Sequence, residues 1–371
     1  MAAALVLLLA PPCPALAASA STASAQGFRF VGFSDSRGRD RGVNDAVLSL
    51  LAAHIKDASG AELVVFPGDM VSGGGASFLG IRDQLAHWRE VMEPLYNDER
   101  FFGARVYPGL GNHEVWGTDG EKAFLEVFPK LPGNGPKGSE GLAYSFDRGT
   151  VHFVMLDTTG SGPGGKQGAA GLPLDWLRSD LKAARERGAE HVFVFGHDPA
   201  FPVASHVAGS LPQLGRKRLF RGYDLSGVKA RDAFWKLLAE FKVAAYVCGH
   251  EHLNAIESID GVFQVVAGAA GAPLYRPNPC GGAEAGLVGK DLEDFEKRSP
   301  YYDLLGYPSG KGGNCQASPD FWGASVFGYF LFEVAGGSVT VQLWGVEPKP
   351  DSRTEVPEGA SVRLLYSRTL R

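Results

Sequence analysis

The sequence predicts a mixed α/β domain in which two β-sheets pack against each other with helices on the outside. Three observations lead to this fold class. Short apolar runs alternate with amphipathic stretches from residue 28 onward, the first five segments follow a β-α-β-α-β order, and the second half closes with strands in meander order. The 371 residues, 44% hydrophobic and 21% charged, can bury a sizeable core as one large domain or two small ones, and we expect one.

The first half of the chain contains three apolar runs that we interpret as buried strands, at residues 28–34, 62–68 and 104–111. Helices are predicted between them. Residues 43–56 have Asn44 in the N-cap region and a set of apolar side chains at helical spacing, which are Val43, Val47, Leu50, Leu51 and Ile55. Residues 80–96 show the same periodicity and are predicted to form the second helix.

The second half has a different texture. Residues 142–147 and 151–158 are predicted to form a hairpin, and helices are expected at 173–187 and 231–241. Further strands are predicted at 191–197 and 243–250, followed by four more strands in meander order, LNAIESI, DGVFQVVAG, FGYFLFEVA and SVTVQLWGV. A Gly/Pro-rich insertion at 272–322 has the character of a lid or binding loop.

The N-terminal 25 residues contain no charged side chain. An apolar stretch is followed by small residues that end in Ala23-Ser24-Ala25, a pattern typical of a cleaved signal peptide. We therefore predict export to the periplasm or out of the cell, with a disordered Ala-rich tail as the alternative. We expect residues 26–348 to form the main domain and 349–371 a C-terminal extension, and no other segment is apolar enough for a transmembrane helix.

The net charge, the cysteines and one basic run limit the kinds of partner and of covalent link that we expect. A net charge of −5 argues against electrostatic binding to nucleic acid. In an exported protein, Cys280 and Cys315 could form one disulfide, whereas Cys248 ends an apolar run and is expected to be buried. The basic run at 214–221 is either a solvated face or a contact for a phosphorylated substrate.

Five polar turns each follow a predicted strand and carry side chains that can bind a metal ion. Strand ends of this kind gather at one edge of an open α/β sheet, and the neighbouring glycines allow sharp turns. The turns are FSDSRG with Asp35, PGDM with Asp69, GNHE with Asn112, His113 and Glu114, GHDP with His197 and Asp198, and CGHEH with His250 and His252. Asp, Asn and His without a thiolate favour Mn, Fe or Zn.

Taken singly, these motifs are of unequal value. A Gly-Asp turn after a strand is often only a turn, and His197 alone could equally be a core or capping histidine. Two histidines at His250 and His252, after a hydrophobic strand and a glycine, are more specific. The ordered set of five carries the prediction of a metal site.

The ordered set resembles the calcineurin-like metallophosphoesterase superfamily, which includes the purple acid phosphatases. The superfamily order is D-x-H, G-D, G-N-H-D/E, a lone histidine and G-H-x-H, and the resemblance covers about residues 28–270. It implies a four-layer α/β/β/α sandwich, which agrees with the order of strands and helices predicted above. It also implies two metal ions bridged by Asp69, one held by Asn112, His197 and His250, and the other held by Asp35 and His252.

The resemblance assigns roles beyond metal binding. His113 would lie over the phosphate and protonate the leaving oxygen, while Glu114 would orient the ligands. We group His113, Arg37 and Glu114 as catalytic, and Arg37, Asn112 and His113 as substrate-binding. The expected reaction is hydrolysis of a phosphate mono- or diester by a metal-activated water, with a small phosphorylated substrate; the alternative is a non-catalytic phosphate- or metal-binding protein. Tyr275, Arg276, Phe201 and His206 are further candidates for the pocket wall.

One motif departs from the superfamily pattern. Arg37 stands where the first motif has a histidine, and an arginine has no lone pair to offer a metal. Purple acid phosphatases compensate with a tyrosine three residues after the Gly-Asp aspartate, but this chain has Ser72 there. Three hypotheses remain open. Both ions bind, with water completing the weaker site; one ion binds and Arg37 replaces part of the second; or Arg37 pairs with Asp35 and leaves only a binding pocket.

Overall fold

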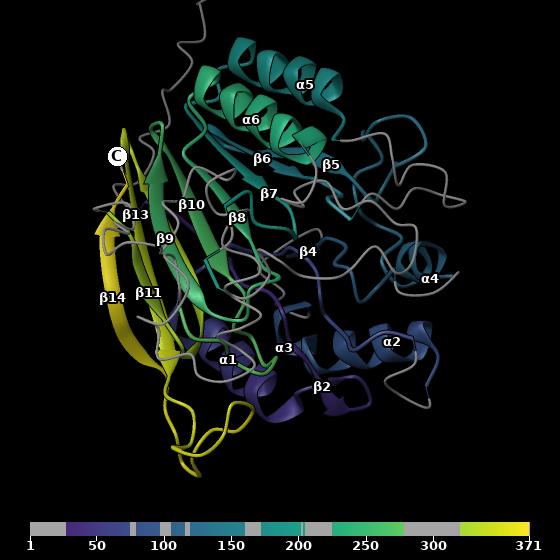
Figure 1. Ribbon diagram of the computed structural model, residues 1–371, viewed down its shortest axis with the longest axis vertical. Coiled ribbons are helices and arrows are strands. Elements are labelled where there is room, and N and C mark those ends of the chain that lie inside the picture. The colour runs from purple at the N-terminus through teal and green to yellow at the C-terminus, as the bar shows by residue number, and fades with distance from the viewer. Residues whose placement is uncertain are drawn as a thin grey trace, which may run out of the picture.

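The protein folds as two β-sheets that face each other, with helices on both outer sides (Figure 1). The computed structural model describes residues 27–74, 79–96, 105–115, 119–159, 172–201, 203–204, 225–277 and 320–370. The layered α/β/β/α arrangement confirms the predicted fold class.

The first sheet has six strands in the order β14-β13-β12-β1-β3-β4. Its parallel part consists of β1 (Phe28–Gly32), β3 (Leu63–Phe66) and β4 (Val106–Pro108). Antiparallel pairing then adds β12 (Phe327–Ala335), β13 (Ser338–Val346) and β14 (Arg363–Thr369). The segment expected as a C-terminal extension thus contributes the edge strand of this sheet.

The second sheet has seven strands in the order β11-β9-β10-β8-β7-β6-β5. The parallel strands are β6 (Val151–Met155), β7 (His191–Phe195), β8 (Ala245–Cys248) and β10 (Val262–Ala267). The antiparallel ones are β5 (Tyr144–Arg148), β9 (Asn254–Ile259) and β11 (Trp322–Ala324). β5 and β6 form the predicted hairpin, in which Gly149 turns the chain with a φ of 58°.

The helices form the two outer layers. Those packed against the first sheet are α1 (Asp45–Ala58), α2 (Ile81–Val91), α3 (Glu93–Tyr96) and α4 (Gly120–Val127), and those against the second are α5 (Leu174–Glu186) and α6 (Leu225–Glu240). The predicted helix at 80–96 was wrong in one respect, because it is divided into α2 and α3. Pro94 has no N–H to donate to the carbonyl of Glu90, so α2 cannot continue.

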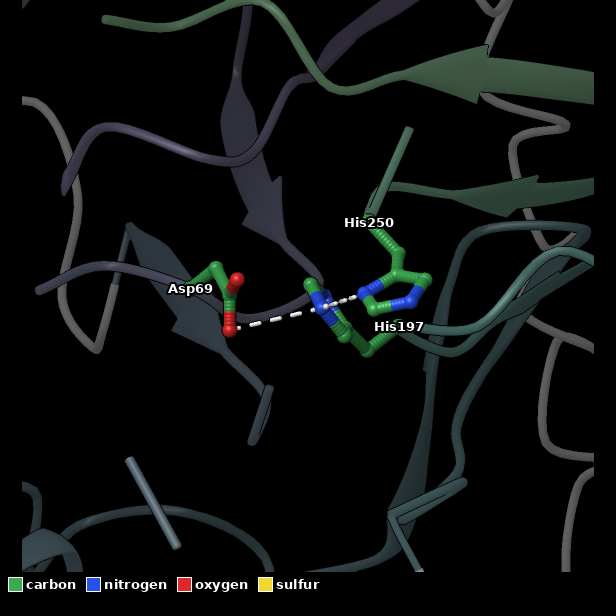
Figure 2. Close-up of side chains that lie close together, drawn as sticks. All are labelled: Asp69, His197 and His250. Atoms are coloured by element: carbon green, nitrogen blue, oxygen red, sulfur yellow. Dashed lines mark hydrogen bonds and ion pairs between the residues drawn. The ribbon is translucent and has the colours of Figure 1, made fainter. Parts of the chain in front are cut away.

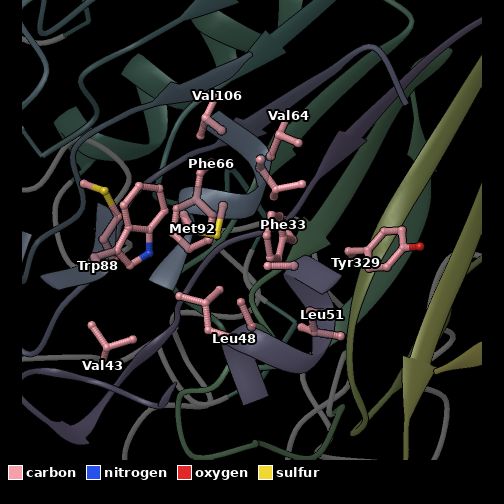
Figure 3. Close-up of a cluster of buried hydrophobic side chains, with 14 of the residues drawn as sticks. Phe33, Val43, Leu48, Leu51, Val64, Phe66, Trp88, Met92, Val106 and Tyr329 are labelled. Atoms are coloured by element: carbon pink, nitrogen blue, oxygen red, sulfur yellow. The ribbon is translucent and has the colours of Figure 1, made fainter. Parts of the chain in front are cut away.

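Aromatic side chains fill the space between the two sheets. Phe30 from β1 stacks on Phe332 from β12 with ring centroids 4.6 Å apart, and meets Phe193 from β7 edge-on at 4.7 Å. A second core lies between the first sheet and its helices, where Phe33, Phe66 and Trp88 pack together (Figure 3). Burying each such side chain contributes about 1.5–3 kcal/mol. Both cores fix the strands whose ends carry the polar turns.

Some predictions lie outside the described residues. These concern the signal peptide, the basic run at 214–221, His206, Cys280 and Cys315, and the insertion apart from residues 272–277 and 320–322. Cys248 is buried, as predicted. Among the described residues, the helices are too short or too polar to cross a membrane. A short strand, β2 (Arg37–Asp40), was not predicted, and it carries Arg37.

Candidate metal centre

The five polar turns meet at the carboxyl ends of β1, β3, β4, β7 and β8, so strands of both sheets contribute to one centre. All six predicted ligands lie in this centre and are buried or nearly so. Five of them make up two groups that could each hold an ion, Asp69–His197–His250 and Asp35–Asp69–His252. The first group is drawn in Figure 2, where the carboxylate of Asp69 and the ring of His250 lie on either side of His197. Ligand sites are expected at such strand ends.

Four side chains converge to form what we call the Asn112 site, composed of Asp69, Asn112, His197 and His250. Nε2 of His197 lies 3.3 Å from Asp69 Oδ1, 3.2 Å from Asn112 Oδ1 and 3.2 Å from His250 Nδ1. Donor atoms that surround one ion with bonds of about 2.0–2.1 Å lie roughly 3.0–3.4 Å from one another. The spacing of these atoms therefore fits a single metal ion.

Hydrogen bonds select which ring nitrogen is free to bind a metal. Nδ1 of His197 lies 3.0 Å from the Pro67 carbonyl oxygen, which can only accept a hydrogen bond. Nδ1 therefore carries the proton, and Nε2 keeps its lone pair for the site. His250 has the opposite orientation, since its Nδ1 faces the site and its Nε2 lies 4.0 Å from Asp198 Oδ1.

Asp35, Asp69 and His252 form a second group, here called the Asp35 site. Oδ1 of Asp35 lies 3.6 Å from Nε2 of His252, and it has no hydrogen-bond partner among the described residues although it is buried. Oδ2 of the same carboxylate accepts from the His250 N–H at 3.0 Å and from the Ser34 hydroxyl. His252 donates from Nδ1 to the Pro273 carbonyl at 2.9 Å, so the lone pair of the ring is on Nε2. A buried carboxylate oxygen without a donor suits a cation.

Arg37 lies at the Asp35 site. Its Nη2 atom is 3.4 Å from Nε2 of His252. The described residues show no ion pair between Arg37 and Asp35, and Nε of Arg37 and Oδ1 of Asp35 both lack a hydrogen-bond partner there. The hypothesis that Arg37 neutralises Asp35 through a direct pair is therefore wrong for this structure.

Burial and mutual charge shape the protonation of the centre. Burial raises the pKa of Asp35 to about 7. Burial also acts to raise the pKa of Asp69, but the charges of His197 and His113 outweigh it and hold that pKa well below its usual range. Burial acts to lower the pKa of His197, yet the carboxylate of Asp69 raises it to about 10. Without a metal, the carboxylates thus draw a proton onto His197, which indicates a centre built for positive charge.

Three of the ligands have a strained backbone. Asp35, Asp69 and His250 have φ values of 64°, 52° and 69°, in the left-handed region that costs about 1–3 kcal/mol for a residue other than glycine. Two glycines that pack against these ligands leave no room for a side chain. A Cβ at Gly111 would strike Asp69, and one at Gly249 would strike Ser34 and Asp35. Strain at ligand positions is typical of functional turns.

Glu114 holds two of the turns together. Its Oε2 accepts from the N–H groups of Asp69 at 2.8 Å and Gly111 at 2.7 Å, and its Oε1 accepts from that of Val71 at 3.2 Å. Burial raises the pKa of Glu114 to about 8. The carboxyl is 1% exposed, and all of these contacts are to backbone. Glu114 therefore fixes the backbone of the Asp69 turn, and its predicted role in orienting the ligands stays a prediction.

His113 points its ring at the same centre without joining either group of donors. Nδ1 lies 2.8 Å from the Ser72 carbonyl and Nε2 lies 3.8 Å from Asp69 Oδ2. Burial lowers the pKa of His113, although the charge of Asp69 opposes this. Ser72 itself donates to the Gly38 carbonyl, so its side chain does not take the place of the tyrosine found in purple acid phosphatases.

Sequence reasoning missed a supporting residue, Thr158, in the turn that follows β6. Its Oγ1 accepts from the N–H groups of His197 and Asp198, both at 3.0 Å, and donates to Asp198 Oδ2 at 2.9 Å. No role of its own was predicted for Asp198. Held by Thr158, its carboxylate lies beside His250, with Oδ1 4.0 Å from Nε2. The signal available in the sequence was the position of Thr158 after a strand, like the other turns.

The predicted pocket-wall residues are only partly brought to the centre. The Tyr275 ring stacks on that of His252 with centroids 4.2 Å apart. Phe201 instead packs against Trp235 and beneath the guanidinium of Arg231, 4.8 Å from the ring centroid. Arg276 is exposed.

Known proteins resemble this chain in sequence and in fold. A family model described as calcineurin-like phosphoesterase matches residues 28–254. Tartrate-resistant acid phosphatase type 5 from mouse (Mus musculus) is 27% identical over 227 residues, which cover 57% of this chain and 61% of the mouse protein. The human (Homo sapiens) protein is 26% identical over the same length and coverage. The match thus spans less than two thirds of these relatives.

Solved structures share the fold. Purple acid phosphatase PPD1 from yellow lupin (Lupinus luteus) superposes with a TM-score of 0.56 at 14% identity, covering 93% of this chain and 54% of the lupin chain. GAP50, the anchor in the inner membrane complex of Plasmodium, gives a TM-score of 0.52 at 15% identity, covering 93% of this chain and 89% of that one. At these identities the similarity concerns the fold.

Proposed function

Because the chain belongs to the calcineurin-like phosphoesterase family, we propose that it is a metal-dependent enzyme that hydrolyses phosphate mono- or diesters of small substrates, with water as the nucleophile. The observation that carries the proposal is the convergence of Asp69, Asn112 and His250 donor atoms within 3.3 Å of Nε2 of His197. Nitrogen and oxygen donors without a thiolate suit Mn, Fe or Zn.

The proposed ligands fall into two groups, one for each metal ion. Asp69, Asn112, His197 and His250 would hold one ion, and Asp35 with Asp69 and His252 would hold another. When bound, such ions supply positive charge against the phosphate and lower the pKa of a water. Asp69 belongs to both groups, so it would set the distance between them.

His113 is proposed to move a proton. Its Nδ1 is held by the Ser72 carbonyl, so the ring is fixed, and Nε2 is the atom directed toward the centre. A proton carried at Nε2 can pass to the leaving oxygen of the ester. The ring side chain is 14% exposed, enough to meet a substrate while its other edge stays buried.

Turnover of model esters tests the proposal. Chain loaded with Mn, Fe or Zn should hydrolyse p-nitrophenyl phosphate or bis-p-nitrophenyl phosphate, while Asp69→Asn should lose at least about 100-fold of that rate. An exposed carboxylate, Glu62, provides the matched control as Glu62→Gln. Metal uptake without turnover above the Asp69→Asn background would contradict the proposal and favour the non-catalytic alternative.

A further inference from the structure

Arg37 places a fixed positive charge directly against one proposed metal ligand. Its Nη2 lies 3.4 Å from Nε2 of His252. That nitrogen has a single lone pair to share, because Nδ1 of the same ring donates to the Pro273 carbonyl. An ion in the Asp35 site and the guanidinium of Arg37 therefore compete for the same atom.

The two sites are unequal in geometry as well. In the Asn112 site, three donor atoms lie 3.2–3.3 Å from Nε2 of His197. In the Asp35 site, Oδ1 of Asp35 lies 3.6 Å from Nε2 of His252, and the arginine stands beside that nitrogen. Oδ1 of Asp35 still lacks a donor among the described residues, so the site can attract a cation. Repulsion by a neighbouring guanidinium would weaken a divalent ion there by at least about 10-fold.

The guanidinium is also placed to meet a phosphate. Arg37 is half-buried, and its Nε is a buried donor without a partner in the described part of the chain. Electrostatic interactions link Arg37 to Asp69 and His113, so its charge reaches the centre shared by both sites. A planar guanidinium can grip two phosphate oxygens at once, which a spherical ion or an ammonium cannot do in the same way.

We propose that Arg37 makes the two metal sites unequal and itself binds the phosphate of the substrate. The Asn112 site holds its ion tightly, the Asp35 site holds its ion at least about 10-fold more weakly, and the guanidinium supplies the second strong positive charge to the phosphate. This inference rests on the proposed function, since it assigns the substrate contact within the same centre.

Metal titration tests the first half. Metal-free chain titrated with Mn²⁺ or Zn²⁺ by calorimetry, with the bound metal counted by elemental analysis, should show one tight and one weak event. Arg37→His should tighten the weak event at least about 10-fold and leave the tight one unchanged. Arg39→His is the matched control, because Arg39 is an exposed arginine on the same strand β2, and it should change neither event.

Phosphate binding tests the second half. Inorganic phosphate titrated into chain that carries one ion should bind Arg37→Ala about 10- to 100-fold more weakly than wild type, with Arg37→Lys in between. Thermal unfolding followed by circular dichroism identifies any variant that fails to fold.

Two equally tight ions in the wild type, or phosphate binding within twofold of wild type in a folded Arg37→Ala variant, would overturn the inference. If such a protein still showed turnover above the Asp69→Asn background, the proposed function would stand and only the inference about Arg37 would fall. A chain that takes up no metal as wild type or as Arg37→His would overturn both.

Discussion

Thr158 offers the sharpest test of how the centre is held, because one hydroxyl serves three partners. Valine has nearly the same shape as threonine, with a methyl group in place of the hydroxyl. The N–H groups of His197 and Asp198 then lose their acceptor, and Oδ2 of Asp198 loses a donor. Thr158 is fully buried, so water does not readily replace the hydroxyl.

The expected loss follows from this count. A buried donor left unpaired costs about 1–3 kcal/mol, so two such donors give about 2–6 kcal/mol. Thr158→Val should therefore lower the free energy of unfolding by at least about 2 kcal/mol. Because the backbone of His197 is no longer held, metal affinity should also fall about 10- to 100-fold.

Urea unfolding of metal-free protein measures the first effect, and metal titration measures the second. The denaturation midpoint should move while the slope stays constant, as for a change in stability alone. Thr150→Val is the control, since Thr150 is exposed in the β5–β6 turn and should change stability by less than about 0.5 kcal/mol. If Thr158→Val matched this control in both measurements, the positioning role of Thr158 would be refuted.

Three further predictions concern charge and space. Burial raises the pKa of Asp157 to about 7, so its contribution to stability is complete below about pH 4 and is lost as pH rises through 7. In urea unfolding of metal-free protein, the free energy of unfolding of Asp157→Asn should exceed that of wild type by up to about 4 kcal/mol at pH 8, and the two should converge toward pH 4. Equal free energies of unfolding at pH 8 would contradict this. Burial acts to raise the pKa of Asp147, but hydrogen bonds from His152 and Arg187 lower it. In urea unfolding, Asp147→Asn should therefore have a lower free energy of unfolding than wild type at pH 7, and the difference should disappear below the lowered pKa. A difference that did not change with pH would be evidence against this role. Gly249→Ala should abolish metal uptake measured by elemental analysis, because the new Cβ would displace Asp35, whereas Gly337→Ala, where a Cβ meets no atom within 4 Å, should retain it. Full uptake by Gly249→Ala would show that the turn can shift to make room for a Cβ.

The sequence was informative where a short pattern determines a local structure. Asp35, Asp69 and His250 each follow a buried strand, Asp69 and His250 directly after a glycine, and the carboxyl ends of parallel strands meet at one edge. The succession of strands along the chain and the place where the candidate ligands meet could therefore be predicted together. The division of the helix at 80–96 could have been predicted as well, since Pro94 removes a backbone donor.

The resemblance placed Arg37 and His252 near the same ion, but their direct contact, which joins β2 to a turn 215 residues later, was not predicted. The hypothesis that Arg37 pairs with Asp35 placed that carboxylate against the guanidinium. In the structure, the strained φ of 64° at Asp35 turns its carboxylate toward the N–H of His250 instead. Thr158 was missed because a single threonine after a strand has no distinctive pattern.

The turns of this centre hold one another in place. Oδ2 of Asp35 accepts from the N–H of His250, and Oδ1 of Asp69 accepts from the N–H of His113. Each bond fixes one carboxylate oxygen to the backbone of a different turn, which offsets part of the strain at φ values of 52–69°. In Asp35 the other oxygen, Oδ1, is thereby directed toward His252 before any ion arrives, whereas in Asp69 the bonded oxygen Oδ1 is itself the one that lies beside His197. Because the bonds cross between turns, a change in one turn must loosen ligands in the next, so metal affinity should respond to substitutions that touch no metal.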